Sequence, residues 1–217
     1  MINIKWFGHS CFKITSNKGI VVVTDPFDPT VGYSPLDIEA DIVTSSHSHY
    51  DHNYFKAIKG DFKIIDKPKE YNVKDIIING IRTFHDNVYG TKRGKNIVFL
   101  INMDGIKLCH LGDLGHTLTD KQLEEIGKVD VLFIPVGGYY TINNEEAVKV
   151  VKQLNPKLTI PMHFKTPEID FPITDEKNFL KELNGGKISS NNIDVDSAFL
   201  KTEKVISLNY KQKILWI

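Results

Sequence analysis

The chain has few cysteines and few arginines for its 217 residues: Cys11 and Cys109 are its only cysteines, and Arg82 and Arg93 are its only arginines. Two cysteines without a paired spacing exclude a disulfide framework and a cysteine-based metal cluster. We expect both to be reduced, buried thiols in a cytoplasmic protein. The N-terminus lacks the apolar run of a signal peptide, and no stretch has the apolar length of a membrane span.

The chain also has no excess of charge of either sign, because 27 lysines and arginines balance 27 aspartates and glutamates. This balance argues against a surface built for nucleic acid, so we expect a small-molecule substrate, no nucleic acid and no membrane partner. A content of 41% hydrophobic and 25% charged residues is ordinary for a globular protein, and the length suits one domain over residues 1–217. Homo-oligomerisation stays open.

The hydrophobic pattern predicts strands at both ends of the chain and helices between them. A capping box at Thr119 predicts a helix that ends near Ile126, and a second helix begins at Asn143 or Asn144. A third, capped helix is expected over residues 174–183, and a helical turn over 53–58. Strands are expected over residues 2–7, 11–15, 19–24, 41–46, 62–65, 71–73, 76–78, 81–84, 97–102, 107–111, 129–134 and 157–162, with a closing hairpin of 204–208 and 214–217.

One short segment is unusually rich in histidine and aspartate: residues 47–52 read His-Ser-His-Tyr-Asp-His. Imidazole and carboxylate together suit zinc, iron or manganese. In extended chain His47 and His49 point the same way and can share one ion, whereas Asp51 and His52 follow as the chain turns. The pattern therefore indicates two metals side by side. The alternative, a polar loop with hydrogen-bonded histidines, is disfavoured by three histidines in six residues.

Three later strands each end in a residue that can bind a metal. His85 follows the apolar run 81–84, Asp113 follows the strand that ends at Leu111, and His163 follows the strand 158–162. The ends of strands are where an α/β sheet usually builds its site. We therefore expect these three side chains to complete the site that residues 47–52 begin.

Seven short motifs together resemble the metallo-β-lactamase-fold hydrolases, and most of all the small branch of metal-dependent hydrolases related to the ascorbate-6-phosphate lactonases. The resemblance implies a mixed α/β (α+β) fold, arranged as a four-layer αββα sandwich. The motifs run in order through most of the chain: Gly8-His-Ser10, Thr24-Asp-Pro-Phe27, Ser46-His-Ser-His-Tyr-Asp-His52, Phe84-His-Asp86, Leu111-Gly-Asp-Leu-Gly-His116, Pro135-Val-Gly-Gly-Tyr139 and Ile160-Pro-Met-His-Phe164.

The resemblance also implies how the ligands are divided. Two divalent ions are expected, zinc first, with manganese or iron as alternatives. One would be held by His47, His49 and His85, and the other by Asp51, His52 and His163, with Asp113 between them. The interval from His52 to His85 is short compared with larger members of the family, so His110 is the alternative to His85. Ser46 stands where the family often has threonine.

Such a site predicts hydrolysis by a hydroxide that bridges the two ions, because two metals lower the pKa of a shared water. Asp51 would orient this hydroxide, and Asp113 would hold the two ions together, so both are assigned to catalysis. A proton donor for the leaving group cannot be chosen from the sequence. The candidates are His116, Tyr139, Tyr140 and Lys165.

Several further residues could support the ligands or contact the substrate, and each has a structural alternative. His9 could support the metal motif or simply be part of a turn, and Asp25 could cap a turn or orient a ligand histidine. His110 could support a ligand or be a hydrogen-bonded core residue. His116 could be a solvated residue. Tyr139 follows paired glycines that permit close approach of a ligand or simply make a turn. Lys92, Arg93 and Lys95 follow His85 and could bind a phosphate or carboxylate, or form a solvated loop.

Three classes of function remain. The leading one is a metal-dependent hydrolase of a small, anionic molecule such as a lactone or a phosphorylated sugar derivative. The second is a phosphodiesterase or nuclease on the same site, which the neutral charge disfavours. The third is a diiron redox or metal-binding protein without hydrolysis. Redox relatives carry a glutamate in the metal motif, and Ser48 and Tyr50 occupy the variable positions here.

Overall fold

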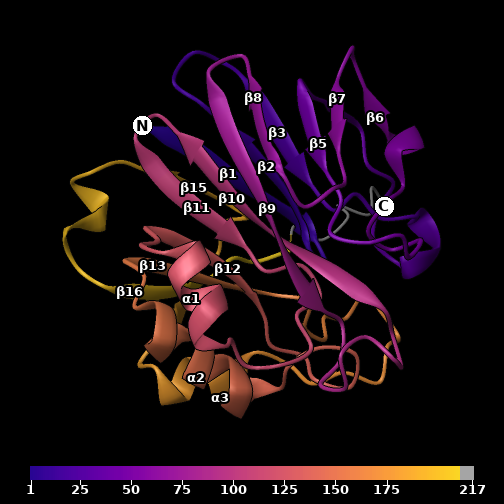
Figure 1. The fold of residues 1–217 in the computed structure, drawn as a ribbon, viewed down its shortest axis with the longest axis vertical. Helices are drawn as coiled ribbons and strands as arrows, with labels where there is room; N and C mark the ends of the chain where they lie inside the picture. The colour runs from indigo at the N-terminus through magenta and orange to yellow at the C-terminus, as the bar shows by residue number, and fades with distance from the viewer. Residues whose placement is uncertain (211–217) are drawn as a thin grey trace, which may run out of the picture.

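Two β-sheets lie face to face in the computed structural model, which describes residues 1–210 (Figure 1). The smaller sheet has the order β15-β1-β2-β3-β5-β7 and the larger the order β14-β16-β13-β12-β11-β10-β9-β8. The strands of the smaller sheet are β1 (Ile2–Gly8), β2 (Cys11–Thr15), β3 (Val21–Thr24), β5 (Ile42–Thr44), β7 (Lys63–Ile65) and β15 (Asn192–Val195). Those of the larger sheet are β8 (Glu70–Val73), β9 (Ile76–Phe84), β10 (Lys95–Met103), β11 (Ile106–His110), β12 (Val131–Pro135), β13 (Leu158–Met162), β14 (Gly186–Lys187) and β16 (Lys204–Ser207).

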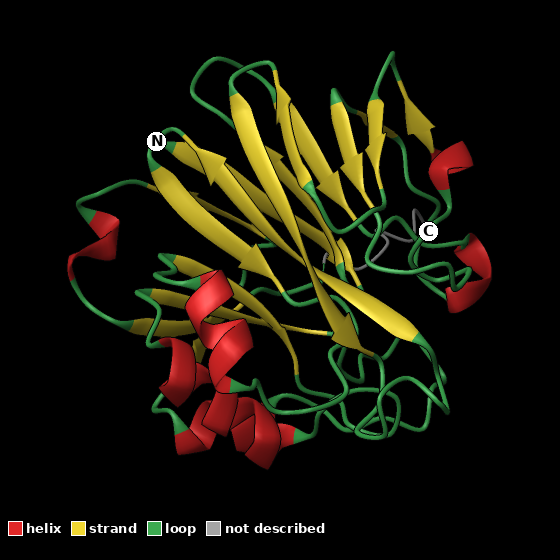
Figure 2. Cartoon of the chain, viewed as in Figure 1, coloured by secondary structure: helices red, strands yellow, loops and turns green. Residues whose placement is uncertain are grey.

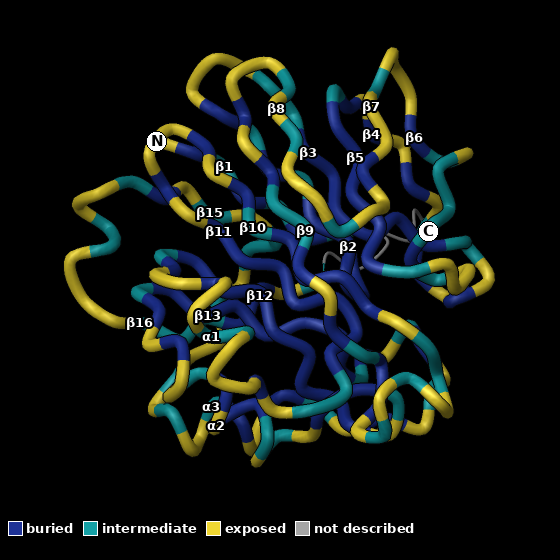
Figure 3. Tube along the Cα trace, in the orientation of Figure 1, coloured by how far each residue is buried: buried dark blue, intermediate teal, exposed yellow. Residues whose placement is uncertain are grey.

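The layer between the sheets follows from the pattern of the sequence. On β1, Ile2, Ile4 and Trp6 are buried and alternate with partly exposed residues, as a strand with one covered face requires. Every residue of β12 is buried, because this parallel strand lies in the middle of the larger sheet and is covered on both faces. Figure 3 shows these buried strands meeting in the interior, with the exposed positions towards the outside of the molecule.

Three α-helices gather on the outside of the larger sheet: α1 (Asp120–Ile126), α2 (Asn144–Leu154) and α3 (Lys177–Glu182) (Figure 2). A capping box begins α1 at Thr119, as the sequence predicted, and another begins α2 at Asn143, one of the two predicted positions. The outer face of the smaller sheet is covered instead by residues 26–40, including the 3₁₀ helix Pro29–Val31, and by the short pair β4 (Ile38–Glu39) and β6 (Ile58–Lys59). The expected mixed α/β class with two facing sheets is confirmed.

The observed elements differ from the expected ones at several places. Residues 76–84 form one strand, β9, rather than two, because it continues through Gly80 as the backbone of residues 67–69 approaches there: a Cβ would lie 2.7 Å from the Lys67 carbonyl oxygen. Helix α3 begins later than expected, since Thr174 donates its amide and hydroxyl to Gly137 O. Strand β15 was not expected, and it pairs antiparallel with β1. The expected strand 214–217 lies outside the described residues.

Two expectations from composition concern the thiols and the membrane. Cys11 and Cys109 are free and buried, and burial raises the pKa of both thiols. In the part of the chain that the structure describes, no helix combines the length and apolar character needed to cross a bilayer.

Candidate metal centre

Strands of both sheets end at one edge, and the loops that leave these ends carry the candidate ligands. The seven side chains expected to bind metal, together with His9, fall into three overlapping groups. Within each group the candidate ligand atoms lie within 4.8 Å of one another. The groups are His47, His49 and His85; His9, Asp51, His52 and His163; and His47, His52 and Asp113.

The first group brings together the two histidines of the extended segment and the one that follows β9. His47 Nε2 lies 2.9 Å from His49 Nδ1, and the ring centroids of His47 and His85 are 4.7 Å apart. His85 is buried, and its Nε2 lies 3.2 Å from Asp113 Oδ2. The ring nitrogens therefore converge on one point, which suits a single ion with nitrogen ligands.

The second group surrounds the carboxylate of Asp51. His9 Nε2 lies 3.1 Å and His52 Nε2 3.5 Å from Asp51 Oδ2. The ring centroids of His163 and His9 are 4.1 Å apart with the planes tilted by 40°, and both side chains are buried. His9 thus joins a cluster of which the sequence predicted only the other three members. The signal was present in the Gly8-His-Ser10 turn, whose structural and functional interpretations could not be separated from sequence.

Asp113 lies between the two groups. Its Oδ2 is 3.2 Å from His85 Nε2 and 3.3 Å from His163 Nε2, whereas its Oδ1 is 3.3 Å from His52 Nε2. A single carboxylate therefore touches ligands of both clusters. This is the position that a bridge between two ions requires.

The unsatisfied polar atoms show that the site fits metal ions. Among residues 1–210, His52 Nε2 and Asp113 Oδ1 are buried side-chain atoms without a hydrogen-bond partner. They approach to 3.3 Å but lack hydrogen-bond geometry. Buried polar atoms are rarely left without a partner, and a cation can satisfy both at once. The donor set of imidazole nitrogens and carboxylate oxygens suits zinc, manganese and iron.

The histidines have the protonation that metal binding needs. Burial, followed by the neighbouring His52, lowers the pKa of His47 to about 3. Burial and His163 lower the pKa of His9 to about 4, and burial also lowers the pKa of His85. Near neutral pH these rings are therefore neutral, and neutral imidazole is the form that binds a metal.

His52 and the carboxylates of Asp51 and Asp113 behave differently, because each stabilises the charged form of the other. Burial alone would lower the pKa of His52, but the carboxylates of Asp113 and Asp51 raise it well above its usual value. Burial alone would raise the pKa of Asp113, yet His163 and His52 hold it well below its usual value. The pKa of Asp51 is lowered in the same way, chiefly by His52. A divalent ion would take the place of the proton on His52.

Asp25 orients the histidines of the metal motif from behind. Its Oδ2 accepts hydrogen bonds from His52 Nδ1 at 2.9 Å and from Ser46 Oγ at 2.6 Å. Ser46 Oγ in turn lies 2.9 Å from His47 Nδ1. Both rings then turn Nε2 towards the site, an arrangement that commonly fixes the tautomer of a metal-binding histidine. Of the two interpretations of Asp25, the structure places it in the orienting position.

Three residues at this edge have a left-handed backbone immediately after a strand. The φ angles are 50° at His9 after β1, 40° at Asp25 after β3 and 50° at His163 after β13. L-residues rarely adopt this conformation, and it costs of order 1 kcal/mol or more at each position. The turn directs His9 and His163 out of their strands and into the cluster, and Asp25 towards His52 behind it.

The remaining candidates from the sequence lie outside the cluster. His110 belongs to none of the ligand groups among residues 1–210, and its Nε2 lies 2.9 Å from Ser10 O, so the geometry favours His85 over His110 as a ligand. His116 accepts a hydrogen bond from Phe84 N. Tyr139 is 64% exposed, and Lys165 pairs with Asp170.

The basic loop after His85 is held by Asp86, whose role was missed from sequence. Its carboxylate accepts four backbone hydrogen bonds at 2.8–2.9 Å, from the amides of Val88, Gly90, Lys92 and Arg93. Burial alone would raise the pKa of Asp86, but these amides lower it to about 2. An aspartate that opens a glycine-containing loop is the signal that could have predicted this anchor. The loop is therefore a fixed structure rather than a loose run of charges.

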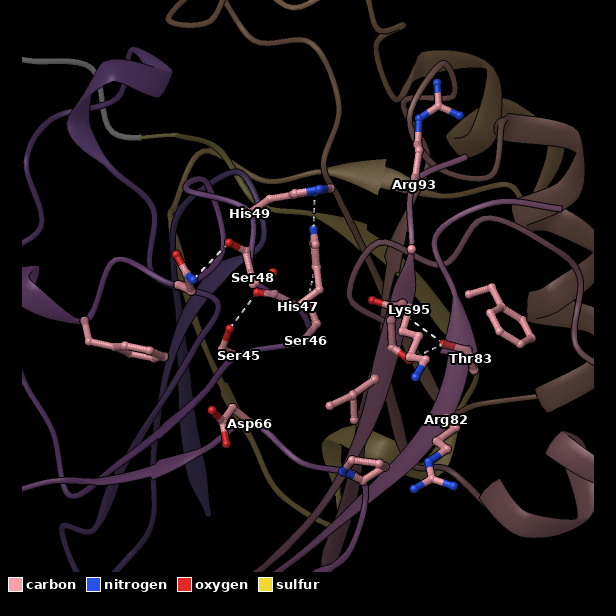
Figure 4. Close-up of a pocket in the computed structure, with 17 residues that line it drawn as sticks. Ser45, Ser46, His47, Ser48, His49, Asp66, Arg82, Thr83, Arg93 and Lys95 are labelled. Carbon is pink, nitrogen blue, oxygen red and sulfur yellow. Dashed lines mark hydrogen bonds between the residues drawn. The ribbon is translucent and has the colours of Figure 1, made fainter. Parts of the chain in front are cut away.

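Two cavities open at the site. The smaller, of about 510 Å³, is lined by His49, Asp51, His85 and Asp113, with Arg93 and Tyr140 among its other residues. The guanidinium of Arg93 lies 5.6 Å from the centre of the Tyr140 ring, a cation–π distance. The larger, of about 920 Å³, lies on the other side of His47 and His49 (Figure 4).

The fold and this site define a class of protein. The chain has two facing sheets with a cluster of histidines and aspartates at their common edge. The family model described as the beta-lactamase superfamily domain matches residues 3–163. The chain belongs to this family, which confirms the resemblance stated from its motifs.

Within the family, the similar proteins are metal-dependent hydrolases. A UPF0173 metal-dependent hydrolase of Thermoplasma acidophilum is 31% identical, over 76% of this chain and 84% of the relative. One of Archaeoglobus fulgidus is 26% identical, over 96% of this chain and 100% of the relative. A solved structure from Thermotoga maritima, assigned to the Zn-dependent hydrolases of the metallo-β-lactamase superfamily, is 44% identical. It has a TM-score of 0.82 over 96% of this chain and 98% of the other.

These relatives confirm the class of enzyme expected from the sequence, a metal-dependent hydrolase. More distant solved structures share the fold alone. Human tRNase Z, short form, is 12% identical with a TM-score of 0.55, over 76% of this chain and 93% of the other. The specific relation to ascorbate-6-phosphate lactonases stays a prediction.

Proposed function

We propose that this protein hydrolyses a small, anionic molecule at a site that holds two divalent metal ions, with zinc expected first and manganese or iron as alternatives. The observation that carries the proposal is the position of Asp113, whose two oxygens contact histidines of both clusters. We assign His47, His49 and His85 to one ion, and Asp51, His52 and His163 to the other, with Asp113 between them.

Two bound ions would supply a hydroxide at neutral pH and would polarise the bond to be cleaved. The residues of the chain provide the rest. Asp51 is positioned by His9, whose Nε2 lies 3.1 Å from Asp51 Oδ2, so its carboxylate can orient the attacking water. Of the four proton-donor candidates, only Tyr140 lines the smaller cavity within the described residues. We therefore propose Tyr140 as the proton donor to the leaving group.

The smaller cavity also supports an anionic substrate. Lys92 and Arg93 line it beside Asp51 and Asp113, and the Asp86 anchor holds their backbone in place. Arginine offers a planar pair of donors that matches a carboxylate or phosphate. A phosphorylated sugar derivative carries such a group, and a lactone that bears a phosphate or carboxylate combines it with a scissile ester bond. A cytoplasmic location and the absence of a nucleic-acid partner stay predictions.

Metal analysis combined with an activity panel tests the proposal. The purified protein is analysed for zinc, manganese and iron, and is then assayed on matched lactones, phosphomonoesters, phosphodiesters and thioesters. We expect about two metals per chain and turnover on an anionic lactone or ester that a chelator abolishes. Turnover that is confined to phosphodiesters, or a metal-loaded protein without hydrolytic activity but with redox chemistry, would replace this proposal with one of its alternatives.

A further inference from the structure

The two cavities at the site share three of their residues. Ser48, His49 and Arg93 line both the smaller cavity, at the metal cluster, and the larger one beyond it. A molecule with its reacting group at the cluster can therefore extend past His49 into a space of about 920 Å³. The larger cavity is part of the same binding region rather than a separate site.

The walls of the larger cavity differ in chemistry. Figure 4 shows Ser45, Ser46 and Ser48 on one side with Asp66 below them, and Arg93, Lys95 and Arg82 in order along the other side. Phe55, Pro68 and Ile97 complete the lining with apolar surface. Hydroxyl groups thus lie on one wall and basic residues on the other, with the guanidinium of Arg93 directed away from Lys95.

The charge of this lining is unusual for the chain. Both arginines of the sequence line the cavity, with Lys95 as a third cation and Asp66 as the one acidic side chain in the lining. The lining therefore carries an excess of two positive charges in a chain whose net charge is zero. None of Arg82, Arg93 and Lys95 forms an ion pair within residues 1–210.

The register of the sheet forces two of these cations together. Lys95 on β10 pairs with Phe84 on β9, and Ile97 pairs with Arg82, so Lys95 and Arg82 lie diagonally on one face of the strand pair. Diagonal neighbours are about 7–8 Å apart, which is within reach of long side chains. Like charges on neighbouring strands repel. An anion bound between Arg82 and Lys95 would be attracted by both side chains and would offset their mutual repulsion.

We propose that Arg82 and Lys95 form a second anion subsite, remote from the scissile bond, so that the substrate carries two anionic groups. One group lies near Arg93 at the metal cluster, and the other, a phosphate or carboxylate, lies between Arg82 and Lys95. This inference rests on the proposed function, since it describes the far end of the same substrate. It predicts an elongated molecule rather than one confined to the smaller cavity.

Anion titration tests the subsite without knowledge of the substrate. The metal-loaded protein is titrated with inorganic phosphate and, separately, with acetate, and calorimetry gives the number of bound anions. We expect one equivalent at the metal cluster and a second that disappears in the double variant Arg82→Ala/Lys95→Ala. Lys63 on β7 is an exposed lysine outside the lining, so Lys63→Ala is the matched control and should keep both equivalents.

The two anions distinguish the chemical class of the distal group. A second equivalent of phosphate alone indicates a phosphorylated end, and one of acetate a carboxylate end. A double variant that binds as many anions as the wild type, with unchanged affinity, would overturn the proposal, as would a single equivalent in the wild type. These outcomes do not depend on turnover, so they are separable from a failure of the proposed function, which the metal and activity panel would reveal.

Once the panel gives a substrate, kinetics provide a second measurement. The double variant should raise KM for the doubly anionic molecule about tenfold more than for its analogue without the distal anion, since charged hydrogen bonds are lost only for the former. Circular dichroism checks that the variant folds. Equal changes in KM for both molecules would show that Arg82 and Lys95 do not contact the substrate.

Discussion

Asp25 and His52 form a fully buried pair in which His52 Nδ1 lies 2.9 Å from Asp25 Oδ2. Within the described residues, the carboxylate lines neither of the two cavities at the site and reaches the cluster through the histidine and through Ser46. Its contribution must therefore be to fix the ring whose Nε2 faces the cluster. Such partners of metal-binding histidines tune affinity without binding the metal themselves.

Asp25→Asn should weaken metal binding by about tenfold to a hundredfold, because the amide no longer holds the His52 tautomer with a charge. Competition with a chromophoric chelator measures the affinity. Asp75→Asn is the matched control, since Asp75 is an exposed carboxylate that lines neither cavity at the site and, within residues 1–210, pairs only with Lys18. Wild-type affinity in Asp25→Asn would show that the pair is only a structural contact.

Asp51→Asn separates chemistry from metal holding. The amide keeps the size and one oxygen donor, so we expect the variant to fold and to retain metal. It loses the charge that orients the attacking water, and removal of one such group commonly costs about a hundredfold or more in rate. Elemental analysis beside kcat on the panel substrate gives both quantities. Retained metal with near-wild-type kcat would make the proposed role of Asp51 wrong.

Arg93→Ala should raise KM for an anionic substrate by about tenfold and KM for a neutral analogue much less. Only the anionic substrate makes a paired contact with the planar guanidinium, so only it loses that contact. Arg93→Lys should restore only part of the difference, since an ammonium cannot make the paired contact. Steady-state kinetics on both molecules measure the effect. An equal rise in KM for both would place Arg93 in a packing role against Tyr140.

Asp86→Ala should loosen the basic loop, because four amides lose their shared acceptor. We expect hydrogen exchange at the amides of Val88, Gly90, Lys92 and Arg93 to become at least about tenfold faster. Asp86→Asn keeps one acceptor oxygen and should lie between the two. Unchanged exchange in Asp86→Ala would mean that another contact holds the loop.

Metal removal should lower the thermal stability of the fold, since ions that bind only the folded state stabilise it. At free metal about a thousandfold above the dissociation constant, removal of each ion costs about 4 kcal/mol. For a chain of this length each such loss corresponds to a fall in Tm of roughly 10 °C. Scanning calorimetry before and after chelation measures the change, and readdition of zinc should reverse it. A Tm that does not respond to chelation would argue against a site closed by both sheets.

The ligand cluster was predictable from sequence because strand ends bring distant residues together. His85, Asp113 and His163 are far apart in the chain, yet each follows a strand, and the structure brings all three to residues 47–52. His9 was left undecided, since a Gly-His-Ser turn has the same sequence whether or not its imidazole faces a site. The Asp86 anchor was missed because it depends on four amides whose positions the loop itself sets.

The boundaries of elements were less predictable than their existence. The capping boxes at Thr119 and Asn143 fixed the starts of two helices, because they depend on local hydrogen bonds. Helix α3 and strand β15 depend on partners remote in sequence: Thr174 bonds to Gly137, and β15 completes the sheet beside β1. The position of Arg82 was equally hidden, since only the pairing of β9 with β10 places it diagonally opposite Lys95.

The left-handed backbone at His9, Asp25 and His163 has a consequence for engineering. Glycine or asparagine would adopt these angles more easily than the residues present. Replacement would relieve about 1 kcal/mol of backbone strain at each position, but it would also remove a side chain that contacts or orients the proposed ligands, whose bound ions would stabilise the fold. A library meant to yield a robust catalyst should keep all three codons fixed and should diversify the helical face of the larger sheet instead.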